Sequence, residues 1–150
     1  KRGDSMTQDE ILQEFEKGFD CCQIIFHEYA KQFHVEEELA YKISTGFGAG
    51  VFQGETCGAV IGAYMALGLV YGQYKTGEEG QEQKVISIIK NAQFREKFIE
   101  KYPSTMCNQL LNADFSTIEG KKKIQEDNSM MTFCPKLMED VFQILEEIIE

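Results

Sequence analysis

Basic residues are scarce in this sequence. Its 150 residues include 15 lysines and arginines against 25 aspartates and glutamates, which gives a formal net charge of −10. Phosphate groups repel a surface of this charge, so the composition argues against nucleic acids and anionic membranes as partners. The one basic cluster, Lys121–Lys123, is interpreted as a solvated turn.

Long apolar runs are also lacking. The longest, Cys57–Gly72, holds sixteen residues, fewer than the roughly 20 that a membrane-spanning helix needs. The chain is therefore expected not to span a membrane. The N-terminal residues contain no apolar core, so no signal peptide is visible. Met6 is a candidate natural start, with residues 1–5 added ahead of it.

No segment alternates convincingly between apolar and polar residues, as a strand would. Apolar residues instead recur at helical spacing, and Thr7 with Glu10 and Asp20 are suitable helix caps. Gly18 either separates two helices or interrupts one long helix. The segments 76–83 and 112–129 are polar and are expected to be loops. The sequence predicts an all-α fold, a compact helical bundle of five or six helices that forms a single domain over residues 1–150.

One stretch, Gly46–Gly72, combines a glycine-rich loop with the central buried helix of the predicted bundle. Closely spaced glycines up to Gly54 indicate tight turns or a close approach of another group. From Cys57 to Tyr71 there is no charged residue, as expected for a helix buried on all sides. Small residues recur every four positions, at Gly58, Gly62 and Ala66, and would let a neighbouring helix approach closely.

Two later helices are expected to be amphipathic. Seven apolar residues mark the first, which ends before Pro103: Val85, Ile88, Ile89, Ala92, Phe94, Phe98 and Ile99. The last helix opens at Cys134-Pro135, since proline suits the first turn. Its buried face is predicted to contain Leu137, Val141, Ile144, Leu145 and Ile148. This apolar C-terminal helix, which ends in Ile148-Ile149-Glu150, is a candidate surface for a homodimer.

The five cysteines include no C-x-x-C pair, which excludes zinc ribbons, thioredoxin-type sites and ferredoxin-type runs. Cysteines without a secretion signal indicate a reducing compartment, so a cytoplasmic location is expected. In such a compartment thiols serve metal or redox chemistry, or they are small buried hydrophobic side chains. Composition leaves both interpretations open.

Four of the cysteines, Cys21, Cys57, Cys107 and Cys134, lie within about the first turn of a predicted helix. Helix N-termini stabilise thiolates, so the pKa values of these thiols are expected to be depressed. The side chain of Cys22 points about 100° away from that of Cys21 on a helix, which favours a packing role. The spacing in sequence supports a shared site only weakly, because the fold would have to gather the cysteines.

The chain resembles a bacterial family, the C_GCAxxG_C_C family, whose members carry the label of redox-active proteins. The resemblance rests on GFDCCQIIF (18–26), ISTGFGAGVFQGETCGAVIGAYMALGLVYG (43–72), CNQLL (107–111) and Cys134. The family's CGAxxG motif stands here as Cys57-Gly58-Ala59-Val60-Ile61-Gly62, and its four cysteines fall on Cys21, Cys57, Cys107 and Cys134.

The resemblance implies a small helical protein, often from anaerobes and encoded near transporters, and a related domain occurs beside an iron–sulfur centre in split-Soret cytochromes. The preferred expectation is an iron–sulfur cluster bound by the four cysteines, for electron transfer to a redox partner or for redox sensing. Gly48, Gly50 and Gly58 are then assigned to cofactor binding through the backbone. The alternatives are reversible disulfides without metal, zinc, or a non-catalytic helical module associated with a transporter.

Other candidates for chemistry are weak. The two histidines, His27 and His34, are interpreted as surface residues, with metal binding the minority interpretation. The carboxylates are spread over the sequence, so no acid–base pair can be named, and no nucleophile motif is present. The sequence therefore does not establish whether the protein is an enzyme.

Overall fold

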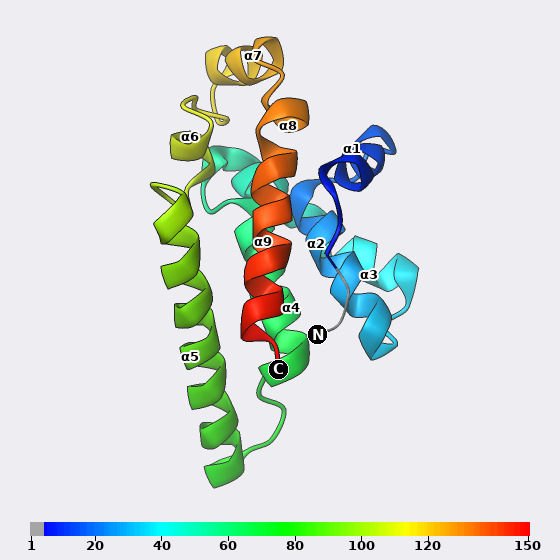
Figure 1. Ribbon diagram of the computed structural model, residues 1–150, viewed down its shortest axis with the longest axis vertical. Coiled ribbons are helices and arrows are strands. Elements are labelled where there is room, and N and C mark those ends of the chain that lie inside the picture. The colour runs from blue at the N-terminus through cyan, green and yellow to red at the C-terminus, as the bar shows by residue number, and fades with distance from the viewer. Residues whose placement is uncertain (1–4) are drawn as a thin grey trace.

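The computed structural model describes residues 5–150, and this part of the chain is built from helices without a β-sheet (Figure 1). The all-α fold class is confirmed, but the described residues form nine α-helices, so the predicted five or six was too low. They are α1 (Gln8–Glu16), α2 (Cys21–Ala30), α3 (Glu37–Ser44), α4 (Gly58–Tyr71), α5 (Gly77–Lys101), α6 (Cys107–Leu110), α7 (Ile118–Glu126), α8 (Ser129–Thr132) and α9 (Cys134–Ile148). Residues 1–4, most of the segment ahead of Met6, lie outside the described residues.

Helix α4 occupies the centre of the bundle, and α2, α5 and α9 pack around it. In Figure 1, α5 runs along one edge, α1–α3 lie on the opposite side, and α6, α7 and α8 form one end of the molecule. The largest fully buried side chains come from the helices around this centre and include Tyr29, Phe94, Phe98 and Phe142. The predicted buried face of α9 is confirmed, since each of its five residues is at most 4% exposed.

The small residues of α4 bring it close to α2, as the sequence predicts. A Cβ atom added at Gly62 would lie 2.9 Å from Cβ of Ile25 and 3.1 Å from the carbonyl oxygen of Cys22. One added at Gly58 would overlap Sγ of Cys21. Glycine is therefore required where the two helices cross, and a cysteine of α2 lies against the first turn of α4.

Helices α1 and α2 begin with the residues that the sequence marks as caps. The backbone N–H of Glu10 donates to Oγ1 of Thr7 at 3.2 Å, and that of Gln23 donates to Oδ1 of Asp20 at 3.0 Å. Gly18, with a φ of +98°, separates the two helices. Asp20 thereby places Cys21 as the first residue of α2.

Two segments expected to be loops are helical. Helix α5 begins at Gly77, where Glu78 and Glu79 suit the positive end of the helix dipole. The side chain of Gln83 accepts hydrogen bonds from the N–H groups of Tyr74 and Lys75 and fixes the chain ahead of the helix. In the second segment, Thr117 caps α7, accepting from the N–H of Gly120 at 2.9 Å. The first turns of α5 and the whole of α7 have too few apolar residues for periodicity to reveal them.

The apolar residues of α5 do not form one buried face. Phe94 and Phe98 are in the core, whereas Val85, Ile88 and Ile89 are about half exposed. At the C-terminus the reverse holds, because Ile148 and Ile149 are buried within the bundle. Ile148 and Ile149 themselves therefore do not present an exposed apolar surface to a second copy, and a homodimer stays a prediction. Among residues 5–150, no helix has both the length and the apolar character needed to cross a bilayer.

Candidate functional site

Four of the five cysteines line one small cavity beside the first turns of α4 and α9. They are Cys21, Cys57, Cys107 and Cys134, and the cavity has a volume of about 20 Å³. Its other walls come from Ala49, Gly58, Ala59, Leu110, Leu111, Met130, Phe133, Leu137 and Met138. The fifth cysteine, Cys22, does not line it and instead places its Sγ 3.6 Å from Sδ of Met65. The structure thus separates the cysteines into the same two groups as the sequence.

Cys57 and Cys107 are brought together by the backbone just ahead of their helices. The N–H of Cys57 donates to the carbonyl oxygen of Thr105 at 2.8 Å, and the N–H of Cys107 donates to that of Glu55 at 2.7 Å. These two hydrogen bonds form a short antiparallel bridge between segments about fifty residues apart. Helices α4 and α6 therefore start side by side, each with a cysteine facing the cavity.

The glycine-rich loop adopts an unusual backbone conformation beside Cys21. Four consecutive residues, 49–52, have φ values of +49°, +61°, +51° and +57°, which describe a left-handed turn. Only one of them is glycine, and positive φ is a genuine outlier for a β-branched residue such as Val51. The turn is closed by a hydrogen bond from the N–H of Glu55 to the carbonyl oxygen of Gly50 at 3.0 Å. Backbone strain of this kind clusters at functional sites.

The three glycines assigned to cofactor binding have different places in the structure. Gly58 lines the cavity, while Gly48 and Gly50 flank Ala49, which also lines it. Gly48 leaves room for the Asp20 side chain, the cap of α2, because an added Cβ would lie 2.6 Å from Oδ2 of Asp20. These contacts give Gly48 a structural role whether or not a cofactor binds.

Cys134 differs from the other three cysteines in its exposure. Cys21, Cys57 and Cys107 are 6%, 9% and 7% exposed, whereas Cys134 is intermediate. It is the first residue of α9, directly after the short helix α8, and its Sγ lies 4.0 Å from Sδ of Met130. Cys134 is therefore the most exposed of the four cysteines.

Burial dominates the electrostatics of the four thiols. It raises the pKa of Cys21 to about 12, of Cys57 to about 11 and of Cys107 to about 12, and raises the pKa of Cys134 well above its ordinary value. Repulsion by neighbouring cysteines adds to each of these increases in pKa. The expectation of depressed pKa values was wrong, because burial destabilises the thiolate by more than a helix N-terminus stabilises it.

Backbone groups nevertheless act on two of the sulfurs in the predicted direction. After burial and repulsion by Cys57, the backbone of Ala49 acts to lower the pKa of Cys21. The backbones of Val60 and Ala59 do the same for Cys57 at the start of α4. The glycine-rich loop and a helix N-terminus thus both present backbone groups to the site.

Proximity of the cysteines does not amount to a formed metal site. Within residues 5–150, no three side chains among histidine, cysteine, aspartate and glutamate are placed to hold one metal ion. The assignment of Cys21, Cys57, Cys107 and Cys134 as ligands therefore stays a prediction.

A buried polar network beside the cavity was missed in the sequence. The hydroxyl of Tyr102 donates to Oδ2 of Asp140 at 2.5 Å, and Nζ of Lys136 donates to Oδ1 at 2.8 Å. The Tyr102 ring packs edge-on against Phe133, a cavity residue, with ring centroids 6.2 Å apart. Although burial acts to raise it, the pKa of Asp140 is held below its usual value by these two hydrogen bonds. The sequence did contain a signal for this network, because Asp140 is an acidic residue among the apolar positions of the last helix.

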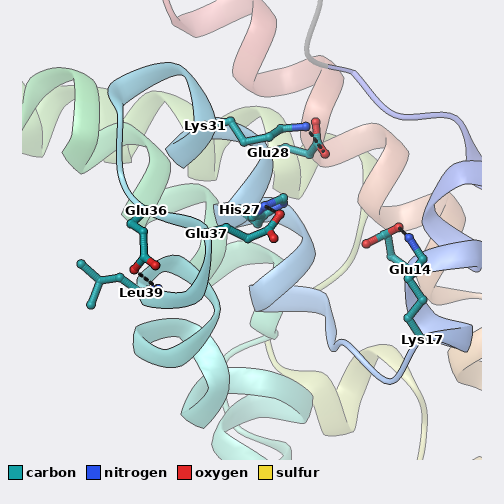
Figure 2. A network of polar contacts seen from close by, with 8 residues as sticks. All are labelled: Glu14, Lys17, His27, Glu28, Lys31, Glu36, Glu37 and Leu39. Carbon is teal, nitrogen blue, oxygen red and sulfur yellow. Dashed lines mark hydrogen bonds and ion pairs between the residues drawn. The ribbon is translucent and has the colours of Figure 1, made fainter.

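The histidines do not belong to the cavity. His27 is buried and its Nε2 lies 3.1 Å from Oε2 of Glu37, as Figure 2 shows. Its ring stacks on Tyr41, with centroids 4.3 Å apart. The interpretation of His27 as a surface residue was therefore wrong, and its contacts stabilise the packing of α3 on α2.

A comparison of the chain with known protein families agrees with this arrangement. The model of a family described as "Putative redox-active protein (C_GCAxxG_C_C)" matches residues 19–148. The chain belongs to the C_GCAxxG_C_C family. The matched range includes all four cysteines of the cavity. The family's name reads GCAxxG, whereas this member has the cysteine before the glycine, at Cys57-Gly58. No curated protein and no solved structure matches the chain.

Proposed function

We propose that Cys21, Cys57, Cys107 and Cys134 form a single redox-active site. The observation that carries this proposal is that four cysteines from four separate helix starts line one cavity, while Cys22 faces elsewhere. The label of the C_GCAxxG_C_C family supports redox chemistry in general terms. The strained turn at 49–52 supports a functional role for the loop beside Cys21.

For the occupant of this site we propose an iron–sulfur cluster that serves electron transfer or redox sensing. The donor set supports it, because the four ionisable groups at the cavity are all thiols, the ligands of such clusters. Besides burial, repulsion by a neighbouring thiolate raises the pKa of each of the four thiols, and a cationic centre between them would reverse that effect. When bound, a cluster would supply one-electron chemistry. Gly48, Gly50 and Gly58 would shape the backbone around it.

The size of the cavity favours a second candidate. About 20 Å³ is room for roughly one water molecule, so the cavity would have to widen to hold a cluster. Reversible disulfide formation needs no such space: two thiols form one S–S bond and release two protons and two electrons to an acceptor. Cys57 and Cys107 are the candidate pair, since their backbones are already bridged. A single zinc ion is the third occupant that thiols would accept.

The test is to purify the protein anaerobically and measure iron, acid-labile sulfide, zinc and the absorption spectrum. We expect coloured protein with iron and sulfide in proportion. Cys57→Ser should abolish the colour, and the matched control Cys22→Ser should retain it. Equal loss in both variants would contradict the assignment of the fifth cysteine.

The same samples distinguish the alternatives. Colourless, metal-free protein whose mass falls by two hydrogens per disulfide on mild oxidation would support thiol–disulfide chemistry instead. Metal-free protein whose thiols all resist oxidation would overturn the redox site altogether. The redox partner, a cytoplasmic location and an association with a transporter belong to the proposal and require separate tests.

A further inference from the structure

Helix α5 exposes a continuous row of aliphatic side chains. Val85, Ile88 and Ile89 are 54%, 60% and 49% exposed, Ile99 is 38% exposed, and Ala92 is exposed as well. Their spacing of three, four and seven residues places them on one side of the helix. We call these five residues the outer stripe.

The outer stripe lies opposite the face of α5 that packs on the bundle. Phe94 and Phe98 form that inner face and are fully buried. Figure 1 shows α5 at the edge of the molecule, with its N-terminal part projecting beyond α4 and α9. Helix α5 therefore has two apolar faces, of which one is packed on the bundle. The other is an exposed apolar surface of the kind that marks an interaction site.

The charges of α5 indicate how this surface pairs. Its N-terminal part, 77–84, has three glutamates and one lysine, a net charge of −2. Its C-terminal part, 90–101, has four basic residues and two glutamates, a net charge of +2. Three of the basic residues, Lys90, Lys97 and Lys101, form ion pairs with Glu150, Glu147 and Asp140 of the same chain, and the fourth is Arg95. In antiparallel orientation Arg95 of one copy faces Glu82 in the acidic N-terminal part of the other, and the helix dipoles favour the same orientation.

We propose that the outer stripe is the interface of a homodimer, in which α5 packs against α5 of a second copy in antiparallel orientation. A two-fold axis near Ile88 and Ile89 places Val85 of one copy opposite Ala92 of the other. A two-fold interface uses the same surface on both copies, so that surface must be complementary to itself. A helix with oppositely charged ends meets this requirement when it pairs antiparallel with its copy. This dimer is independent of the proposed redox function.

The first test measures the oligomeric state of the full chain by sedimentation velocity over a dilution series. We expect a monomer–dimer equilibrium, and Ile88→Glu should raise its dissociation constant at least tenfold. The matched control is Ile118→Glu, the same substitution at an isoleucine that is 86% exposed on α7, which should leave it unchanged. Should Ile88→Glu fold poorly by circular dichroism, Val85→Lys replaces it.

A wild-type chain that stays monomeric at every concentration would overturn the proposal. A dimer that Ile88→Glu leaves intact would place the interface elsewhere and overturn it as well. Monomeric protein that instead binds uncharged phosphatidylcholine vesicles through the outer stripe would assign this face to a membrane surface.

The orientation has its own test. Val85→Cys and Ala92→Cys variants are mixed, oxidised mildly and analysed without reductant, with the wild type as control for the native thiols. Antiparallel packing predicts cross-links between the two variants in the mixture and few in Val85→Cys alone. Cross-linking of Val85→Cys alone, with none added by mixing, would show a parallel dimer and refute this geometry.

Discussion

Helices α4 and α5 pack against each other and are both rich in apolar residues, but they use them differently. Helix α4 carries no charge, and Gly58, Gly62 and Ala66 are buried in contact with its neighbours. Helix α5 is charged along its length, buries Phe94 and Phe98, and leaves most of its aliphatic residues exposed. Hydrophobicity alone therefore does not determine which residues of this protein enter the core.

The difference follows from where each helix lies. Helix α4 lies at the centre, and on the face that meets α2 an atom added at Gly58 or Gly62 would meet a neighbour. Helix α5 lies at the edge, where, within residues 5–150, one face packs on the rest of the bundle and the opposite face is exposed (Figure 1). The aromatic residues Phe94 and Phe98 of α5 pack in the core, whereas most of its aliphatic residues lie on an exposed surface.

The largest expected effect separates the two faces of α5. Phe98 is fully buried and stacks on Phe94 and Tyr102, with centroids 6.0 Å and 5.0 Å away. Phe98→Ala should lower the free energy of unfolding by about 3–5 kcal/mol. Ile88→Ala should change it by less than about 0.5 kcal/mol in dilute, monomeric protein. Urea unfolding followed by circular dichroism measures both, and similar losses would show that the outer stripe is part of the core.

A smaller effect tests the close packing of α4. Gly62→Ala places a methyl group 2.9 Å from Cβ of Ile25, and overpacking of this kind should cost about 1–3 kcal/mol. Gly68→Ala is the control in the same helix, because nothing lies within 4 Å of its added Cβ. It should raise stability by about 0.5–1 kcal/mol, since glycine is a poor helix former. If Gly62→Ala stabilises as much as Gly68→Ala, the contact between α2 and α4 is looser than described.

Local signals accounted for much of this fold. The caps at Thr7 and Asp20 and the break at Gly18 each determine structure within a few residues and appear as predicted. The uncharged run from Cys57 forms the predicted helix, but it is not buried on all sides, since Gly68 is exposed. Helix α7 escaped notice because polar residues dominate it, and tertiary contacts stabilise it. The number of helices was underestimated for the same reason.

The site depends on contacts that no local pattern reveals. Helix starts identify the four cysteines as similar, but only the bridge between the segments ahead of Cys57 and Cys107 brings two of them together. The pKa expectation failed because it weighed the helix dipole without the cost of burial, which follows from the packed fold. The left-handed turn at 49–52 was also hidden, since three of its residues are not glycine.

The smallest expected effect concerns the buried thiol at the start of α4. Burial raises the pKa of Cys57 from an ordinary value of 9.0 to about 11, so the folded protein holds this proton more tightly than the unfolded chain. The stabilisation is complete below pH 9 and is lost as the pH rises towards 11. At pH 10 this single thiol should reduce the free energy of unfolding by about 1 kcal/mol. Reduced, metal-free protein unfolded in urea at pH 8 and pH 10 provides the measurement.

The comparison between the helices supplies the control for this effect. Cys57→Ser removes the titrating group, so its loss of stability between the two pH values should be smaller than that of the wild type by about 1 kcal/mol. Val85→Ser, at an exposed position of α5, alters no ionisable group and should retain the wild-type dependence on pH. Parallel curves for the wild type and Cys57→Ser would mean that water reaches this sulfur in the folded protein. The cavity at the start of α4 would then resemble the exposed face of α5 more than the core.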